Sequence, residues 1–238
     1  MPNRLVDDSA LDRSPVVANA TMNRGRGLCG VNSYERELRL NPLDVLLSLL
    51  RDGREAAWLD LCCGRGRALI EAGLRLRDSG LAEQAVLVGV DLVPMFDPVP
   101  VNLRCVRLEA VSLRQWSAPR TFDLVTCVHG LHYVGDKLDL LRRVTGWLAP
   151  GGLFAANLHL ANVNVLRKTS GGTKPVRGWA ARALGAAGFN YDGRRRLVRR
   201  TGGATVAPFP CHYLGADDAA GPNYTHQPVV TSCYIVND

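Results

Sequence analysis

The chain has 238 residues, of which 47% are hydrophobic, and it carries a formal net charge of +7. This length and composition can bury the core of one α/β domain with a short appendage, which argues against a second independent domain. The longest apolar stretches are strand-sized, well short of the roughly 20 residues that a membrane-spanning helix needs. Much of the positive charge comes from one arginine cluster: Arg194, Arg195, Arg196, Arg199 and Arg200. We interpret this cluster as the solvated face of a hairpin, with an acidic substrate, a phosphate-bearing carrier or RNA as the alternative partners.

The first 20 residues have little apolar periodicity and lack the apolar run of a secretory signal. They predict a mobile tail on a cytoplasmic protein. Residues 42–50 then carry leucines at the spacing of an amphipathic helix. We therefore expect residues 1–55 to form a tail and helical cap, and residues 56–238 to form the main domain.

From residue 56 onward, short apolar runs alternate with helical patterns. The predicted strands are residues 57–61, 86–90, 103–108, 124–128 and 153–158. The predicted helices are residues 68–76, 137–148 and 175–187. This alternation is typical of a doubly wound, mostly parallel Rossmann-like sheet with helices on both faces. Such a sheet binds its ligand beyond the carboxyl ends of its strands, near the point where the strand order reverses.

After residue 188 the pattern changes. Residues 196–200 and 229–236 are β-like, and no convincing helix separates them. We predict that they pair as antiparallel strands at the C-terminal edge of the sheet. Residues 208–228, between them, are rich in turn formers and form an unusually long loop, which in a compact domain is often functional.

The seven cysteines suggest reduced core residues rather than disulfides, because their number is odd and no export signal precedes them. Several lie in apolar runs, among them Cys105, Cys127 and Cys233. Cys62 and Cys63 are adjacent, which is not the spacing of a zinc site. The sequence therefore predicts no metal.

The strongest local signal is residues 58–66, WLDLCCGRG, a strand that ends in an acid and opens through glycines into a helix. Glycines let the backbone approach a ligand closely, and the acid can accept a hydrogen bond from an amine or a hydroxyl. A dinucleotide-binding fingerprint would have glycine where Leu69 stands, so that type of site is disfavoured. The next strand ends in Asp91, whose carboxylate suits the two hydroxyls of a ribose. The combination predicts a nucleoside site.

From about residue 56 to residue 158 the chain resembles the class I S-adenosylmethionine-dependent methyltransferases. Residues 60–66 match the family's DLGCGxG signature except that Cys62 replaces its first glycine, and Asp91 matches the ribose acid. Residues 107–110, RLEA, stand where an adenine-contact motif Gly-Asp-Ala is usual. Residues 122–129, FDLVTCVH, resemble the fourth motif, and residues 148–153, LAPGGL, resemble the turn before the fifth strand.

The resemblance implies S-adenosyl-L-methionine as the cofactor. It places Asp60 near the cofactor's amino group, Asp91 on the ribose hydroxyls, and Glu109 with Ala110 at the adenine. The full set of residues that it assigns to the cofactor is Arg26, Tyr34, Asp60, Cys62, Gly64, Gly66, Asp91, Glu109, Ala110 and Cys127. Of these, Arg26 and Tyr34 reach the cofactor carboxylate or cover the pocket, and the alternative is that they are exposed helix residues.

Methyl transfer displaces an already activated carbon, so positioning and desolvation do much of the work and a general base is optional. If the acceptor is a hydroxyl, a proton must leave, and His129 and His132 are the candidates to take it. Asp217 and Asp218 suit a cationic or amine acceptor, with Asp218 as a third catalytic candidate. The loop residues predicted to hold the acceptor are Tyr213, Asp217, Asn223 and Tyr224. The alternative is an Asp-rich turn without a partner.

We therefore predict a methyltransferase that acts on a small-molecule or modified-peptide acceptor, by N- or O-methylation in natural-product biosynthesis. Residues 24–46 loosely resemble the openings of bacterial enzymes that dimethylate the amino terminus of azole-containing peptides. One alternative is an RNA or other nucleic-acid methyltransferase, but residues 127–130 read Cys-Val-His-Gly, and aromatic residues do not alternate with the arginines. The other alternative is a cofactor-binding protein without transferase activity.

Overall fold

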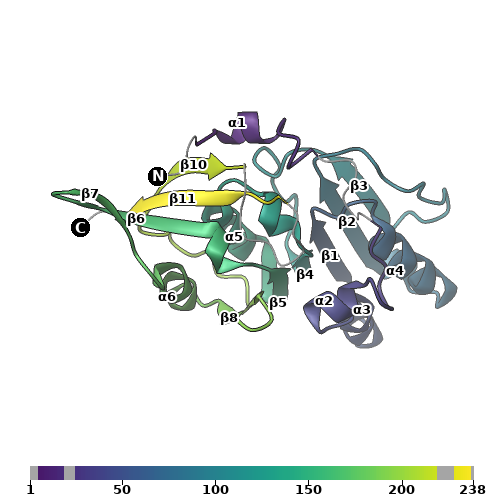
Figure 1. Ribbon diagram of the computed structural model, residues 1–238. Helices are drawn as coiled ribbons and strands as arrows, with labels where there is room; N and C mark the ends of the chain where they lie inside the picture. Colours follow the sequence, from purple (N-terminus) through teal and green to yellow (C-terminus); the bar gives the residue numbers. More distant parts are fainter. Residues whose placement is uncertain (1–4, 19–24, 219–227, 237–238) are drawn as a thin grey trace.

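A computed structural model describes residues 5–18, 25–218 and 228–236. Its main element is a seven-stranded sheet in the order β3-β2-β1-β4-β5-β9-β8 (Figure 1). The parallel strands are β1 (Ala56–Leu61), β2 (Ala85–Asp91), β3 (Val106–Ala110), β4 (Phe122–Cys127) and β5 (Leu148–Asn157). The strands β8 (Asn190–Asp192) and β9 (Leu197–Thr201) form a hairpin that is antiparallel to β5. The predicted doubly wound, mostly parallel Rossmann-like sheet with an antiparallel edge is confirmed.

Helices cover both faces of this sheet, because strands such as β1 are buried along their whole length. One face packs against α2 (Tyr34–Leu38), α3 (Pro42–Arg51) and α4 (Arg67–Asp78), and the other against α5 (Lys137–Trp147) and α6 (Trp179–Ala186). The predicted helices are confirmed. Helix α6 is shorter than predicted because Pro175 ends a strand and Gly178, at φ +69°, begins the helix only afterwards. The 3₁₀ turns are η1 (Ala82–Gln84), η2 (Gly130–Tyr133) and η3 (Leu160–Asn162).

A second, four-stranded sheet lies beside the first, in the order β10-β11-β6-β7 (Figure 1). Its strands are β6 (Val163–Thr169), β7 (Gly172–Pro175), β10 (His212–Asp217) and β11 (Thr231–Val236). The predicted pairing of residues 196–200 with residues 229–236 is therefore wrong, because β9 pairs with β5 and β11 pairs in parallel with β6. The reason is burial: Tyr234 and Val236 of β11 and Val163 and Val165 of β6 pack together into the core on the side of α5 and α6. The predicted loop 208–228 is likewise a strand over the residues of β10.

The N-terminal segment packs onto the second sheet, so the predicted mobile tail is wrong for residues 5–18. Val6 exchanges two backbone hydrogen bonds with Ala216, of 2.9 and 3.0 Å. Helix α1 (Asp8–Leu11) buries Leu11, which joins Val17 and Val230 in a small apolar cluster. Figure 1 shows α1 above β10. No helix within the described ranges is long and apolar enough to cross a membrane.

Candidate active site

A cavity of about 220 Å³ lies at the carboxyl ends of β1 and β4, where the strand order of the main sheet reverses. This is the position at which an open α/β sheet binds its ligand. Its walls come from the N-terminal segment, the β1–α4 turn, the segments after β2 and β3, and the β4–α5 connection. The predicted site residues that line it are Arg26, Tyr34, Cys62, Gly64, Asp91, His129 and His132.

The β1–α4 turn and Asp91 form one fixed unit of this wall. Cys62 and Gly64 adopt φ values of +55° and +61°, a conformation that glycine takes without strain and cysteine does not. The backbone N–H of Gly64 donates to Asp91 Oδ2 at 2.8 Å, and that of Val93 donates to Oδ1 at 3.0 Å. Each carboxylate oxygen can accept a further hydrogen bond, so Asp91 can also receive two hydroxyls of a ligand.

Asp60, at the end of β1, lies behind the wall. It accepts hydrogen bonds from the hydroxyls of Tyr34 and Thr126, each at 2.6 Å, and Trp58 Nε1 donates to the same threonine oxygen at 2.8 Å. Burial raises the pKa of Asp60 to about 7. Asp60 does not line the cavity, whereas Tyr34 does. Asp60 is therefore connected to the cavity by its hydrogen bond with Tyr34.

The β4–α5 connection carries the two histidines. His129 has φ +58°, and its backbone N–H donates to Asn157 Oδ1 at 3.2 Å. Its Nε2 lies 3.0 Å from Glu37 Oε2. His132 is 3% exposed, and burial lowers its pKa to about 3. His132 is therefore neutral at physiological pH, while His129 is paired with a carboxylate at the cavity wall.

Comparison with known protein families identifies the family to which this chain belongs. The pattern of a family described as "Methyltransferase domain" matches residues 34–201, more than two thirds of the chain. The chain belongs to the methyltransferase-domain family. The predicted resemblance to the class I S-adenosylmethionine-dependent methyltransferases is thereby confirmed at the level of the domain family.

Among curated proteins, the methyltransferase is similar to the ubiquinone biosynthesis O-methyltransferase of Idiomarina loihiensis, with 31% identity over 97 residues, or 40% of this chain and 38% of that protein. It is also similar to the trans-aconitate 2-methyltransferase of Pseudomonas aeruginosa, with 34% identity over 122 residues, or 51% and 42%. The chain spans less than half the length of these two relatives. The solved structure of CalS10, an amino pentose methyltransferase from Micromonospora echinaspora, is 19% identical and covers 71% of this chain and 91% of its own, with a TM-score of 0.46.

The predicted adenine contacts lie away from the cavity of the methyltransferase. Glu109 and Ala110 end β3, and neither lines the cavity. The Glu109 carboxylate accepts from Trp116 Nε1 and pairs with Arg107, each at 2.9 Å. Among the cavity residues that the sequence prediction missed are Leu92, Ser112 and Leu113. They follow the ends of β2 and β3, so the strand-end rule alone could have found them.

Two further predicted residues also lie just outside the cavity. Gly66 precedes α4 at φ +74°, and a Cβ atom there would come within 2.6 Å of Leu108 Cδ1, so only glycine fits. Cys127 is fully buried at the end of β4. A Cβ atom on Gly130 would lie 2.3 Å from Cys62 Cβ and 2.8 Å from Cys127 Sγ. The floor of the cavity is therefore closely packed.

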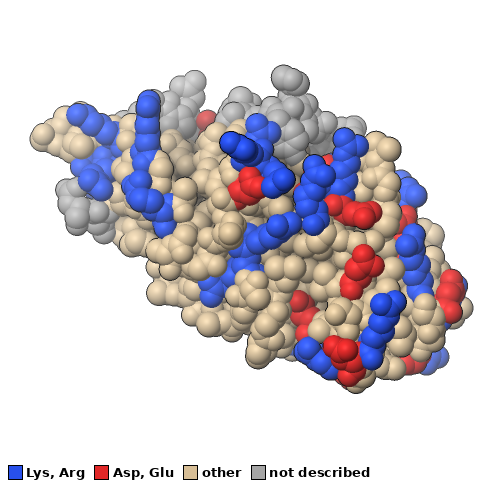
Figure 2. Space-filling model, turned by 90° about the horizontal axis from the view of Figure 1, so that it is seen from below, with Lys and Arg blue, Asp and Glu red and all other residues tan. Residues whose placement is uncertain are grey.

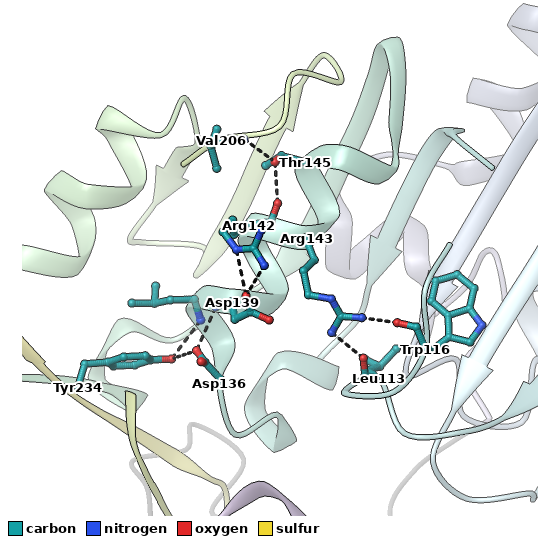
Figure 3. Close-up of polar contacts among 10 residues, drawn as sticks. Leu113, Trp116, Asp136, Asp139, Arg142, Arg143, Thr145, Val206 and Tyr234 are labelled. Atoms are coloured by element: carbon teal, nitrogen blue, oxygen red, sulfur yellow. Dashed lines mark hydrogen bonds and ion pairs between the residues drawn. The ribbon is translucent and has the colours of Figure 1, made fainter. Parts of the chain in front are cut away.

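The start of α5 supplies acids to the cavity and anchors its wall (Figure 3). Asp136 caps α5 and accepts from the hydroxyl of Tyr234 at 3.0 Å. Arg143, on the same helix, donates to the carbonyl oxygens of Leu113, at 2.8 Å, and of Trp116. This guanidinium ties the segment after β3 to α5, so the wall that carries Leu113 is held in place.

The predicted acceptor residues are dispersed. Tyr213 donates to Asp8 Oδ1 at 2.7 Å, and it is Asp8 that lines the cavity. Asp218 accepts from the hydroxyl of Ser14, and Asp217 lines a separate hollow between β6, β11 and α6. The structure therefore does not bring these three residues into the cavity. Two other predicted residues lie outside the described residues: Asn223 and Tyr224.

The arginine cluster divides into two parts. Arg194 to Arg196 form the turn of the β8–β9 hairpin. Arg194 and Arg195 are exposed, as expected of a solvated hairpin, and Arg195 pairs with Asp192 at 2.9 Å, whereas Arg196 is half-buried. The prediction is wrong for Arg199 and Arg200, which are partly buried and donate to the carbonyl oxygens of other segments. On the face shown in Figure 2, basic and acidic side chains lie interspersed over the right-hand half. The basic residues therefore do not form a continuous track on that half.

No three His, Cys, Asp or Glu side chains within the described ranges gather in a way that would hold a metal ion. All seven cysteines are thiols without a disulfide partner; Cys63, Cys127 and Cys233 are buried, whereas Cys29 is exposed and not a core residue as predicted.

Proposed function

We propose that this methyltransferase transfers the methyl group of S-adenosylmethionine to an amine of a small molecule or a modified peptide. The observation that carries the proposal is a single cavity that is lined by the Gly64 and Asp91 unit, by His129 and by several carboxylates. The Gly64 and Asp91 unit suits a nucleoside, and His129 and the carboxylates suit an acceptor.

The chemistry of the lining fits the cofactor. The Asp91 carboxylate can accept from both ribose hydroxyls, and Gly64 presents backbone without a side chain. The Arg26 guanidinium suits the carboxylate of the methionine portion. Leu92 and Leu113 offer an apolar surface for the adenine. When bound, S-adenosylmethionine supplies a methyl group on a positively charged sulfur, which needs no further activation.

The protein's part is to hold the acceptor in line and to take its proton. Of the two histidines, we propose His129 as the base, because the buried His132, with a pKa of about 3, binds a proton poorly at neutral pH. Burial of the apolar walls excludes water and strengthens each polar contact inside the cavity.

The acids in the cavity favour an amine acceptor. Besides Asp91, four carboxylates line it: Asp8, Asp12, Asp136 and Asp139. Like charges that lie close together repel, and a cationic amine lowers this repulsion, whereas an acidic acceptor would raise it. Burial, with Asp8 and Asp139 as neighbours, raises the pKa of Asp136, which is the expected sign of such crowding.

The test is a methyl-transfer assay with S-adenosylmethionine and a panel of primary amines, free amino-terminal peptides and matched hydroxyl compounds. We expect S-adenosylhomocysteine to form only with amines. We also expect His129→Ala to lower kcat/KM by about 100-fold or more without changing the affinity for the cofactor. A loss below about tenfold would leave His129 a positional role only, and turnover of the hydroxyl compounds alone would overturn the amine assignment.

A further inference from the structure

His129 has a carboxylate partner from a segment far away in the sequence. Helix α2 places Glu37 Oε2 at 3.0 Å from His129 Nε2, and the two side chains are 29% and 12% exposed. A carboxylate only accepts hydrogen bonds, so Nε2 carries the hydrogen and, in the neutral ring, the lone pair is on Nδ1. The pair therefore fixes one tautomer of a residue that lines the cavity.

Several further contacts hold the backbones of His129 and Glu37 next to each other, so the contact between the two side chains is fixed by the fold. Asn157 accepts from the backbone N–H of His129 at 3.2 Å and donates to the backbone carbonyl of Glu37 at 3.5 Å. At the ends of α2, Tyr34 donates to Asp60 at 2.6 Å, and Arg199 donates to the carbonyl of Leu38 at 2.6 Å. The carboxylate is thus presented by a helix that is itself anchored at both ends.

The surrounding charges keep Glu37 ionised. The hydrogen bond with His129 is the largest cause that lowers the pKa of Glu37, and the positive charges of Arg26 and Arg36 add to it, while burial opposes them. The ring of His132 lies 5.7 Å from that of His129. The charged or titratable groups that act on His132 in turn are His129, Lys137, His159 and Arg196. Glu37 is therefore a carboxylate held directly against His129.

We propose that Glu37 is a positioning residue for methyl transfer, which orients the imidazole of His129 and stabilises the charge that this ring gains when it takes a proton from the acceptor. The inference rests on the proposed function, since it takes His129 as the base. The acceptor nitrogen loses its proton to the imidazole and then forms the bond to the methyl carbon with its lone pair. The carbon–sulfur bond breaks and its electrons remain on the sulfur, and the imidazolium returns its proton to water.

The test compares Glu37→Gln with Glu37→Asp and with the control Glu35→Gln, an exposed acid on the same helix. Glu37→Gln keeps the size and removes the charge. We expect it to lower kcat by about tenfold to hundredfold, the range for a lost hydrogen bond to a charged group, with the KM for S-adenosylmethionine within about twofold. Glu37→Asp recovers part of the activity, and Glu35→Gln retains all of it.

A measurement without any acceptor completes the test. In the parent protein, ¹⁵N NMR of the imidazole should show the Nε2–H tautomer of His129, and Glu37→Gln should give a mixture of tautomers. A parental kcat and tautomer in Glu37→Gln would overturn the inference, as would a loss of thermal stability and cofactor affinity with the parental tautomer, because that result would describe an anchor for α2. If His129→Ala retains full activity, the base assignment itself fails. If His129→Ala is inactive and Glu37→Gln is not, only the role of Glu37 fails.

Discussion

Replacing Asp91 by Asn tests how the cavity holds the cofactor. The carboxylate already accepts from the N–H groups of Gly64 and Val93, at 2.8 and 3.0 Å, and it is 4% exposed. The proposed cofactor adds two ribose hydroxyls. Hydrogen bonds to a charged group contribute roughly 1.5–3 kcal/mol each, and Asn removes the charge and one accepting oxygen. We expect a loss of roughly 3 kcal/mol of binding free energy, which is more than 100-fold in Kd.

The assay is isothermal titration calorimetry with S-adenosylhomocysteine, on protein shown to be folded by circular dichroism. Glu109→Gln is the matched control, since Glu109 is held by Trp116 and Arg107 outside the cavity, and its Kd should stay within about threefold of the parent. A parental Kd in Asp91→Asn would refute the assignment of this carboxylate to the ribose. A large loss of affinity for S-adenosylhomocysteine in Glu109→Gln would instead indicate that the adenine binds beside Glu109, as the sequence motif predicts.

Three further predictions follow from the same structure. Replacing Arg194 and Arg195 by Gln should leave turnover and cofactor affinity within about twofold of the parent, because exposed charges interact weakly across screened distances; a larger change in the transfer assay would contradict this. Gly130→Ala should lower stability by about 1–3 kcal/mol in urea melts, because the added Cβ atom would come within 2.3 Å of Cys62 Cβ, and an unchanged midpoint would contradict that packing. For His132, the unfolded imidazole takes a proton as the pH falls through about 6.5, but burial keeps the folded pKa near 3, so the free energy of unfolding should decrease between these values. His132→Gln should flatten that decrease in urea melts at pH 4 and 7.5, and an identical slope in both proteins would argue against a neutral buried His132.

The sequence was sufficient for the half of the fold whose signals are local. Strands β1, β2 and β4 are buried on both sides, so they appear as uninterrupted apolar runs, and each ends where the chain must turn toward a helix. Their carboxyl ends must then meet at one edge of a parallel sheet. That is why Gly64 and Asp91 could be placed in one site before the structure was known.

The second sheet could not be predicted, because its pairing joins distant segments. Strand β6 is exposed beyond residue 166, and it reads as polar there. Its partner β11 follows about 70 residues later, and neither segment alone shows which strand it pairs with. The docking of the N-terminal segment could not be predicted either, because only a few apolar residues, such as Val6 and Leu11, hold it and the segment has no visible periodicity.

The acceptor side of the site was the least predictable part. The acidic pair Asp217 and Asp218 stood out by composition, but alternation along β10 and a bond to Ser14 direct these residues away from the cavity. The acids that do line it, such as Asp8 and Asp136, read locally as helix caps or first-turn residues. The pairing of Glu37 with His129 likewise depends on how α2 docks, which no local pattern reports.

A crystal structure of the protein grown with S-adenosylhomocysteine tests the proposed cofactor site directly. We expect the ligand to occupy the cavity at the ends of β1 and β4, with both ribose hydroxyls within hydrogen-bond distance of Asp91 and its sulfur on the side of His129. A ligand bound in the hollow between β6, β11 and α6, or one bound in the cavity without contact to Asp91, would contradict it.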